Sequence, residues 1–380
     1  MSVNSMPKEN KMGTMPVKKL IFNMALPLII SMLIQALYNI VDSIFVSRIS
    51  EDALTAVSLA FPAQNLMIGL ATGTAVGVNA LMGRALGAGQ RERADKVANH
   101  GILLALVGFV ISALLGATCS DLFFRSQTQI ENIIRMGNDY LRVVTIGSLG
   151  MFCQIMYERL LQGTGHSILS MYTQGAGAII NIILDPIFIT ILNPYGMGIE
   201  AAAYATVLSQ FIQAAVTLWY FKKKSPNVKI GRIRIDGTLL PQVLSVGVSA
   251  LLMQILTLVQ QTVIYRVASN YGGETSQLLL GAALRFWNFS FVPLWGISQG
   301  FQPAAGTNYG AKDYDRVKKL TKVFIIAATL LSLVFYIPVE LFPEKILSMF
   351  LTTPGIAASG ATNFRIMFST YILQGSFLIA

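Results

Sequence analysis

Long apolar blocks separated by short polar segments dominate the pattern of this chain. A helix of about 20 apolar residues crosses a hydrocarbon core about 30 Å thick. Apolar and polar residues do not alternate as they do in half-buried β-strands. We therefore predict ten membrane-spanning helices, with the second and eighth continuing past the bilayer: residues 20–47, 54–83, 97–120, 137–160, 167–192, 200–221, 240–267, 277–308, 319–341 and 360–380.

The composition supports an all-α integral membrane protein and excludes several other classes. Hydrophobic residues make up 54% of the 380 residues and charged residues 12%, whereas soluble domains carry about 25% charged residues. The two cysteines, Cys119 and Cys153, lack CxxC spacing, and the two histidines lie at segment ends. Neither a metal site nor a redox pair is predicted. We expect no cofactor and no enzyme activity, because no catalytic group of His, Cys and Ser is visible at one depth.

The basic residues, which give the chain a net charge of +10, alternate between the two sides of the predicted membrane. They gather before the first span and in every second loop, most densely at residues 84–96, 222–234 and 312–322. Such a bias places those loops, and with them the N-terminus, in the cytoplasm. Because the basic segments alternate with membrane crossings, a nucleic-acid partner is also excluded.

An internal repeat relates residues 73–97 to residues 296–320. Parallel repeats of this kind occur in secondary transporters, and the glycine spacing allows close helix packing. We predict a six-helix lobe at 1–221, a cytoplasmic linker at 222–239 and an incomplete lobe at 240–380, with two further spans expected after Ala380. The matched residues are Gly73, Gly77, Gly83, Gly87, Arg93 and Lys96 with Gly296, Gly300, Gly306, Gly310, Arg316 and Lys319.

Two isolated aspartates, Asp42 and Asp185, lie inside predicted spans. Each falls in the outer half of the bilayer by its distance from the cytoplasmic start of its helix. Ionisable residues at such depth are costly and mark ion or substrate pathways. Carboxylate, amide and hydroxyl oxygens suit Na⁺, and desolvation favours a protonated carboxyl group. The alternative is a structural polar cluster. The predicted cation site comprises Asp42, Asn181, Asp185 and Thr206, lined by Tyr38, Asn39 and Tyr140.

Other polar residues and two prolines are further candidates for hinges, an ion pair and a substrate cavity. Pro27 and Pro186 are predicted as hinges, although prolines can also be tolerated as kinks. Glu158 is predicted to form an interfacial ion pair with Arg159. A second group suggests a substrate cavity in the second half, with interfacial anchoring or interhelical hydrogen bonding as the alternative; it comprises Gln254, Gln260, Gln261, Arg285 and Trp287.

Three strings resemble the multidrug and toxic compound extrusion (MATE) family: LPLIISMLIQALYNIVDSIFVSRI (26–49), GTGHSILSMYTQGAGAIINIILDPIFI (163–189) and GMGIEAAAYATVLSQ (196–210). The resemblance implies two six-helix lobes around a cavity. It also implies a monomeric bacterial plasma-membrane antiporter that exports cationic or amphipathic compounds in exchange for inward H⁺ or Na⁺.

The chain looks most like the DinF-type branch of that family. There the cation site matches Asp42, Asn181, Asp185 and Thr206, with Gln35 and Tyr140 lining it and Pro27 as the bend in the first span. Another branch of the family has an acid in the seventh span. In this chain the predicted seventh span, 240–267, has glutamines and no acid. A flippase for lipid-linked precursors and a non-transporting fragment remain as alternative functions.

Overall fold

The computed structural model describes residues 11–225, 228–231, 236–351 and 355–379, and every regular element in these ranges is helical. The all-α prediction is therefore confirmed. The elements are α1 (Lys11–Thr14), α2 (Val17–Ser47), α3 (Glu51–Gly87), α4 (Arg91–Arg125), α5 (Glu131–Ile146), α6 (Leu149–Gly163), α7 (Ser167–Leu192), η1 (Asn193–Tyr195), α8 (Gly198–Lys224), α9 (Leu239–Gly310), α10 (Tyr314–Leu341), α11 (Pro343–Ser348), α12 (Ile356–Phe368) and α13 (Tyr371–Ile379).

Most helices extend beyond the predicted apolar spans because their ends carry helix signals. Ser50 caps α3 by accepting a hydrogen bond from the backbone N–H of Ala53 at 3.0 Å, and acidic residues fill its first turn. The long helix α9 reverses at Gly273, whose φ of 64° requires glycine-like freedom. Among the described residues, seven helices are long and apolar enough to span a membrane, by length and composition.

Two predicted spans are each split into two helices. The span 137–160 breaks at Gly147 and Ser148, between α5 and α6. A side chain at Gly147 would collide with Val207 of α8, 2.6 Å from a Cβ atom placed there. The span 360–380 breaks at Ser369 and Thr370, between α12 and α13. At the offset of Gly73 from Gly296, Gly147 of the first break aligns with Thr370 of the second, so the two breaks match to within one residue.

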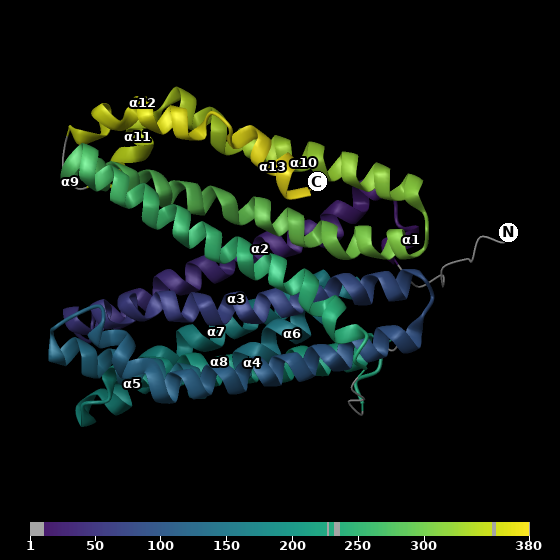
Figure 1. Ribbon diagram of the computed structural model, residues 1–380, viewed down its shortest axis with the longest axis horizontal. Coiled ribbons are helices and arrows are strands. Elements are labelled where there is room, and N and C mark those ends of the chain that lie inside the picture. Colours follow the sequence, from purple (N-terminus) through teal and green to yellow (C-terminus); the bar gives the residue numbers. More distant parts are fainter. Residues whose placement is uncertain (1–10, 226–227, 232–235, 352–354, 380) are drawn as a thin grey trace.

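The helices form an N-terminal bundle, α2 to α8, and a C-terminal bundle, α9 to α13, which lie one above the other in Figure 1. Each bundle has a hydrophobic core. The start of α2, at Leu20 and Met24, belongs to the core of the C-terminal bundle. The start of α9, at Leu239 and Val243, belongs to the core of the N-terminal bundle. The first helix of each bundle therefore packs into the other.

The repeated glycines lie where the bundles meet. Gly77 of α3 contacts the carbonyl group of Val243 in α9, and a Cβ atom at Gly300 would lie 2.8 Å from the Cα atom of Ala25 in α2. The absence of side chains lets the helix backbones approach closely. The contacts follow the repeat, because the second helix of each half packs on the first helix of the other. We call the end of the bundles near Lys18 and Lys222 the basic end.

Candidate functional site

The two intramembrane aspartates meet in the N-terminal bundle. Asp42 lies near the last turns of α2 and Asp185 near the last turns of α7, and both turns lie at the end opposite the basic end. Asp185 is fully buried and Asp42 is half-buried. Their carboxyl groups are close enough to interact directly. The sequence prediction that they share one depth therefore corresponds to a side-chain pair.

Asn181 links this pair to α8. Its Nδ2 donates to Asp185 Oδ1 at 3.2 Å and lies 3.5 Å from Thr206 Oγ1. Asn181 and Thr206 are both buried. Two buried oxygens, Asn181 Oδ1 and Asp185 Oδ2, have no hydrogen-bond partner among the residues that the structure describes. Buried polar atoms are nearly always partnered, so these oxygens are available to a proton or a bound cation.

Two tyrosines lie beside the acid pair. Tyr38 of α2 and Tyr140 of α5 both lie near enough to Asp42 and Asp185 to interact electrostatically with them. Gln64 of α3 donates to the Tyr140 hydroxyl at 3.1 Å. Gln64 was missed by the sequence prediction, although its amide inside the predicted span 54–83 was a visible signal.

No basic side chain neutralises the acids within the described ranges. The ion pairs found there join Lys96 to Glu92 and Arg125 to Asp121 and Glu131, all near helix ends. The same ranges hold no group of three or more His, Cys, Asp or Glu residues able to hold a metal ion. Two carboxyl groups with amide and hydroxyl oxygens instead suit a proton or a hard monovalent cation.

A protein-family model described as MatE matches residues 27–187 and 249–380. The chain belongs to the MatE family. A relative, the probable multidrug resistance protein YoeA of Bacillus subtilis, is 27% identical over 92% of this chain and 77% of its own length. The FAD transporter of Shewanella oneidensis is 23% identical over 90% of this chain and 76% of its own length.

The fold also matches a solved structure titled as the outward-facing conformation of a multidrug resistance MATE family transporter of the MOP superfamily. The TM-score is 0.84 at 26% identity, over 98% of this chain and 86% of the other. These similarities establish a multi-pass MATE-type membrane protein that is related to multidrug transporters and is not an enzyme.

The remaining residues predicted around the MATE cation site lie in α2, before Asp42, and in α7. Gln35 accepts a hydrogen bond from Gln174 Nε2 at 3.2 Å, and both Gln35 and Asn39 are exposed. Pro27 and Pro186 lie inside α2 and α7, which stay continuous helices through them. Gln35 and Asn39 therefore lie on an exposed face of α2, outside the buried cluster.

The predicted ion pair between Glu158 and Arg159 is wrong. Both side chains are buried, but Glu158 Oε1 accepts from Gln213 Nε2 at 2.7 Å and Arg159 Nη1 donates to Gln162 Oε1 at 3.1 Å. Adjacent residues on a helix point about 100° apart. The two side chains therefore hydrogen-bond to separate partners inside the bundle, while they stay near enough to interact electrostatically.

The polar residues predicted as a substrate cavity in the second half have different surroundings. Trp287 packs edge-on against Phe368 and Tyr371, with ring centroids 5.1 and 5.2 Å away. Arg285 and Gln260 are exposed and Gln261 is half-buried, whereas the side chain of Gln254 lies outside the described residues. Trp287 is therefore half-buried and packs against the core of the C-terminal bundle.

Proposed function

We propose that this MATE protein is a secondary antiporter that exports cationic or amphipathic compounds in exchange for H⁺ or Na⁺ bound at Asp42, Asn181, Asp185 and Thr206. The observation that carries this proposal is that buried oxygens of Asn181 and Asp185 have no hydrogen-bond partner, in a cluster whose two acids form no ion pair among the described residues. Two uncompensated carboxylates repel each other at short distance. A bound proton or Na⁺ reduces that repulsion, so the acid pair favours binding of one of these cations.

Helix α2 supplies a physical route from ion binding to movement of the bundles. It carries Asp42 near one end, while its other half packs on the C-terminal bundle. Gly296 and Gly300 of α9 press against the α2 backbone at Ala25 and Ile29, on either side of Pro27. Proline removes one helix hydrogen bond and permits bending. A change of charge at Asp42 can therefore alter the α2 curvature that the C-terminal bundle contacts.

Coupling requires that the ion bind one conformation more tightly than the other. Replacing Asp42 by Asn removes a charge and keeps the side-chain shape. We expect Asp42→Asn to insert normally and to lose efflux driven by an imposed Na⁺ or pH gradient. The measurement is gradient-driven transport of ethidium by protein reconstituted in liposomes, with insertion checked by the yield of folded protein.

The matched control is Asp121→Asn, because Asp121 is an exposed acid in an ion pair with Arg125. Exposed ion pairs contribute little to the stability of a protein. This control should transport as the unmodified protein does. Full gradient-driven efflux by Asp42→Asn would show that the polar cluster is only structural.

The basic end is proposed to face the cytoplasm of a bacterium, with the protein in the plasma membrane. Basic loops are retained on that side during insertion. In a chain whose Cys119 and Cys153 are both replaced by Ser, Lys223→Cys should therefore resist an impermeant thiol reagent added to intact cells and react once the cells are opened. Labelling from outside would reverse the proposed orientation.

A second candidate function is export of an anionic organic compound, favoured by the similarity to the protein named as an FAD transporter. Direct comparison of ethidium and FAD transport in the same liposomes separates the two. We expect ethidium to be transported, and transport of FAD alone would favour the second candidate.

A further inference from the structure

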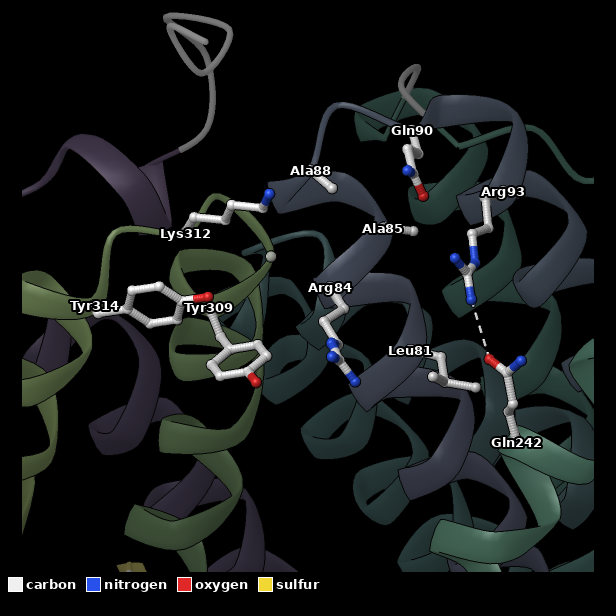
Figure 2. A pocket seen from close by; sticks show the side chains of 11 residues that line it. Leu81, Arg84, Ala85, Ala88, Gln90, Arg93, Gln242, Tyr309, Lys312 and Tyr314 are labelled. Carbon is white, nitrogen blue, oxygen red and sulfur yellow. Dashed lines mark hydrogen bonds between the residues drawn. The ribbon is translucent and has the colours of Figure 1, made fainter. Parts of the chain in front are cut away.

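A cavity of about 450 Å³ opens between the two bundles at their basic end. Figure 2 shows that α3 and α4 supply one wall, with Arg84 and Arg93, and that the end of α9 and the start of α10 supply the facing wall. The facing wall carries Tyr309, Lys312 and Tyr314. The volume is within the range of small-ligand sites.

The charged side chains that line the cavity are all positive. Arg84, Arg93 and Lys312 line the cavity, and no carboxylate belongs to its lining. None of the three takes part in the ion pairs found in the described part of the chain. The neighbouring acid, Asp313, caps α10 by accepting from the backbone N–H of Arg316 at 3.0 Å. The cavity therefore concentrates positive charge that an anion can balance.

Lys312 holds a backbone conformation that its residue type disfavours. Its φ is 60°, and it is the only non-glycine residue with positive φ among those described. The corresponding position in the first half of the repeat is Gly89, with φ of 72°. Left-handed backbone is strained for residues with a Cβ atom. Strain of this kind points to a role for the side chain, and Lys312 extends toward the cavity (Figure 2).

Aromatic and amide contacts orient the two arginines. The Arg84 guanidinium carbon lies 4.8 Å from the centre of the Tyr309 ring, and Tyr309 packs edge-on against Tyr314 at 5.6 Å. A guanidinium stacked in this way keeps its in-plane N–H donors free for an anion. Arg93 Nη2 donates to Gln242 Oε1 at 3.0 Å and retains its other donors.

We propose that this cavity binds a phosphate group, carried by an anionic lipid headgroup or by a soluble phosphate compound, and that the bound group bridges the two bundles. Arginine donates paired hydrogen bonds to phosphate, and lysine adds a point charge. Basic pockets at membrane-helix ends are suited to anionic headgroups. The bridge joins Arg84 and Arg93 of one bundle to Lys312 of the other, so occupancy favours the state in which these ends are together.

The test uses the whole chain in phosphatidylcholine nanodiscs and follows its thermal unfolding. One arm adds phosphatidylglycerol to the discs, and the other titrates inorganic phosphate against chloride at equal ionic strength. We expect the unfolding temperature to rise in at least one arm. Arg84→Gln and Lys312→Gln should each weaken that response about tenfold in midpoint concentration, the effect of losing one charge-assisted contact.

Lys318→Gln is the matched control, because Lys318 is exposed on α10 and lies outside this cavity. It should respond as the unmodified protein does. Lys312→Gly should unfold at the same or a higher temperature without phosphate, because strain is relieved, and its response should be weakened as in Lys312→Gln. Stabilisation by phosphatidylglycerol alone assigns the group to lipid, and stabilisation by phosphate alone assigns it to a soluble compound. An unchanged response in both cavity variants, or an equal loss in Lys318→Gln, would overturn the proposal.

Discussion

The two halves of the repeat share a backbone plan and differ in the chemistry of their interiors. Both have glycines that pack on the other half, and both have a helix break within one residue of the matching position. In the first half, Asp42 and Gln64 belong to a polar cluster. At the corresponding positions the second half has Tyr265 and Trp287, and Trp287 packs into an aromatic core.

The two halves therefore share the residues that set helix packing and differ in the residues that could bind an ion. Close helix approach needs small residues along both copies, so the glycines recur. A buried charge is costly in a bilayer, so one polar site per repeat pair is less expensive than two. We therefore expect the proposed coupling ion to bind in the first half, whereas the second half has aromatic packing at the corresponding position.

The largest expected effect comes from removing the acids of the first half. Asp185→Asn should abolish gradient-driven efflux, and the double variant with Asp42→Asn should be no worse, because groups that act as one site are not additive. Tyr265→Phe, at the position that corresponds to Asp42, should keep full efflux. The measurement is transport in liposomes for all three variants. Loss of coupling in Tyr265→Phe would place part of the ion site in the second half.

The next effect compares Gln64 with Trp287. Trp287→Ala removes ring contacts in the C-terminal bundle and should lower the free energy of unfolding by about 3 kcal/mol. Gln64→Ala removes one hydrogen bond to Tyr140 and should cost about 1 kcal/mol, while weakening ion binding. Denaturation in detergent measures the free energy of unfolding of both variants. The stabilisation that each variant gains from added ion measures ion binding. If Trp287→Ala weakened ion binding more than Gln64→Ala, the division of roles would be wrong.

A smaller effect concerns the packing between the bundles. Gly300→Ala would place a Cβ atom 2.8 Å from the α2 backbone at Ala25 and should cost about 1 to 3 kcal/mol by overpacking. Gly175→Ala is the matched control, because its Cβ atom would meet only the flexible tip of Ile34 at 3.7 Å. Thermal unfolding measures both. Equal stability of the two variants would contradict close packing at the repeat glycines.

The sequence predicted the helices well because apolar length alone sets a membrane span. The helix 167–192 was predicted at its observed bounds. The break at Gly147 was missed because it depends on a neighbour, Val207, from another helix. Gly147 and Ser148 are a weak local signal, because such residues also occur inside membrane helices. The same limit applies to Ser369 and Thr370 at the second break.

The acid pair was predictable because an isolated charge in an apolar span stands out in the sequence. Asn181 followed from helical spacing, at four residues from Asp185. Gln64 was missed because a neutral amide is a weaker signal and its partner lies on α5. The error at Glu158 arose from assuming that adjacent opposite charges pair, whereas their side chains leave the helix in different directions.

The central claim is that the N-terminal bundle alone binds the coupling ion through its acid pair. Infrared difference spectroscopy of the reconstituted protein measures this directly, by recording carboxyl signals when pH or Na⁺ is changed. We predict a protonated-carboxyl band that responds to pH, that Na⁺ suppresses if it competes, and that disappears in the Asp42→Asn and Asp185→Asn double variant. It should persist in Glu158→Gln and in Tyr265→Phe. A band that survives in the double variant when Glu158 is also replaced by Gln, or that disappears in Glu158→Gln alone, would contradict the claim.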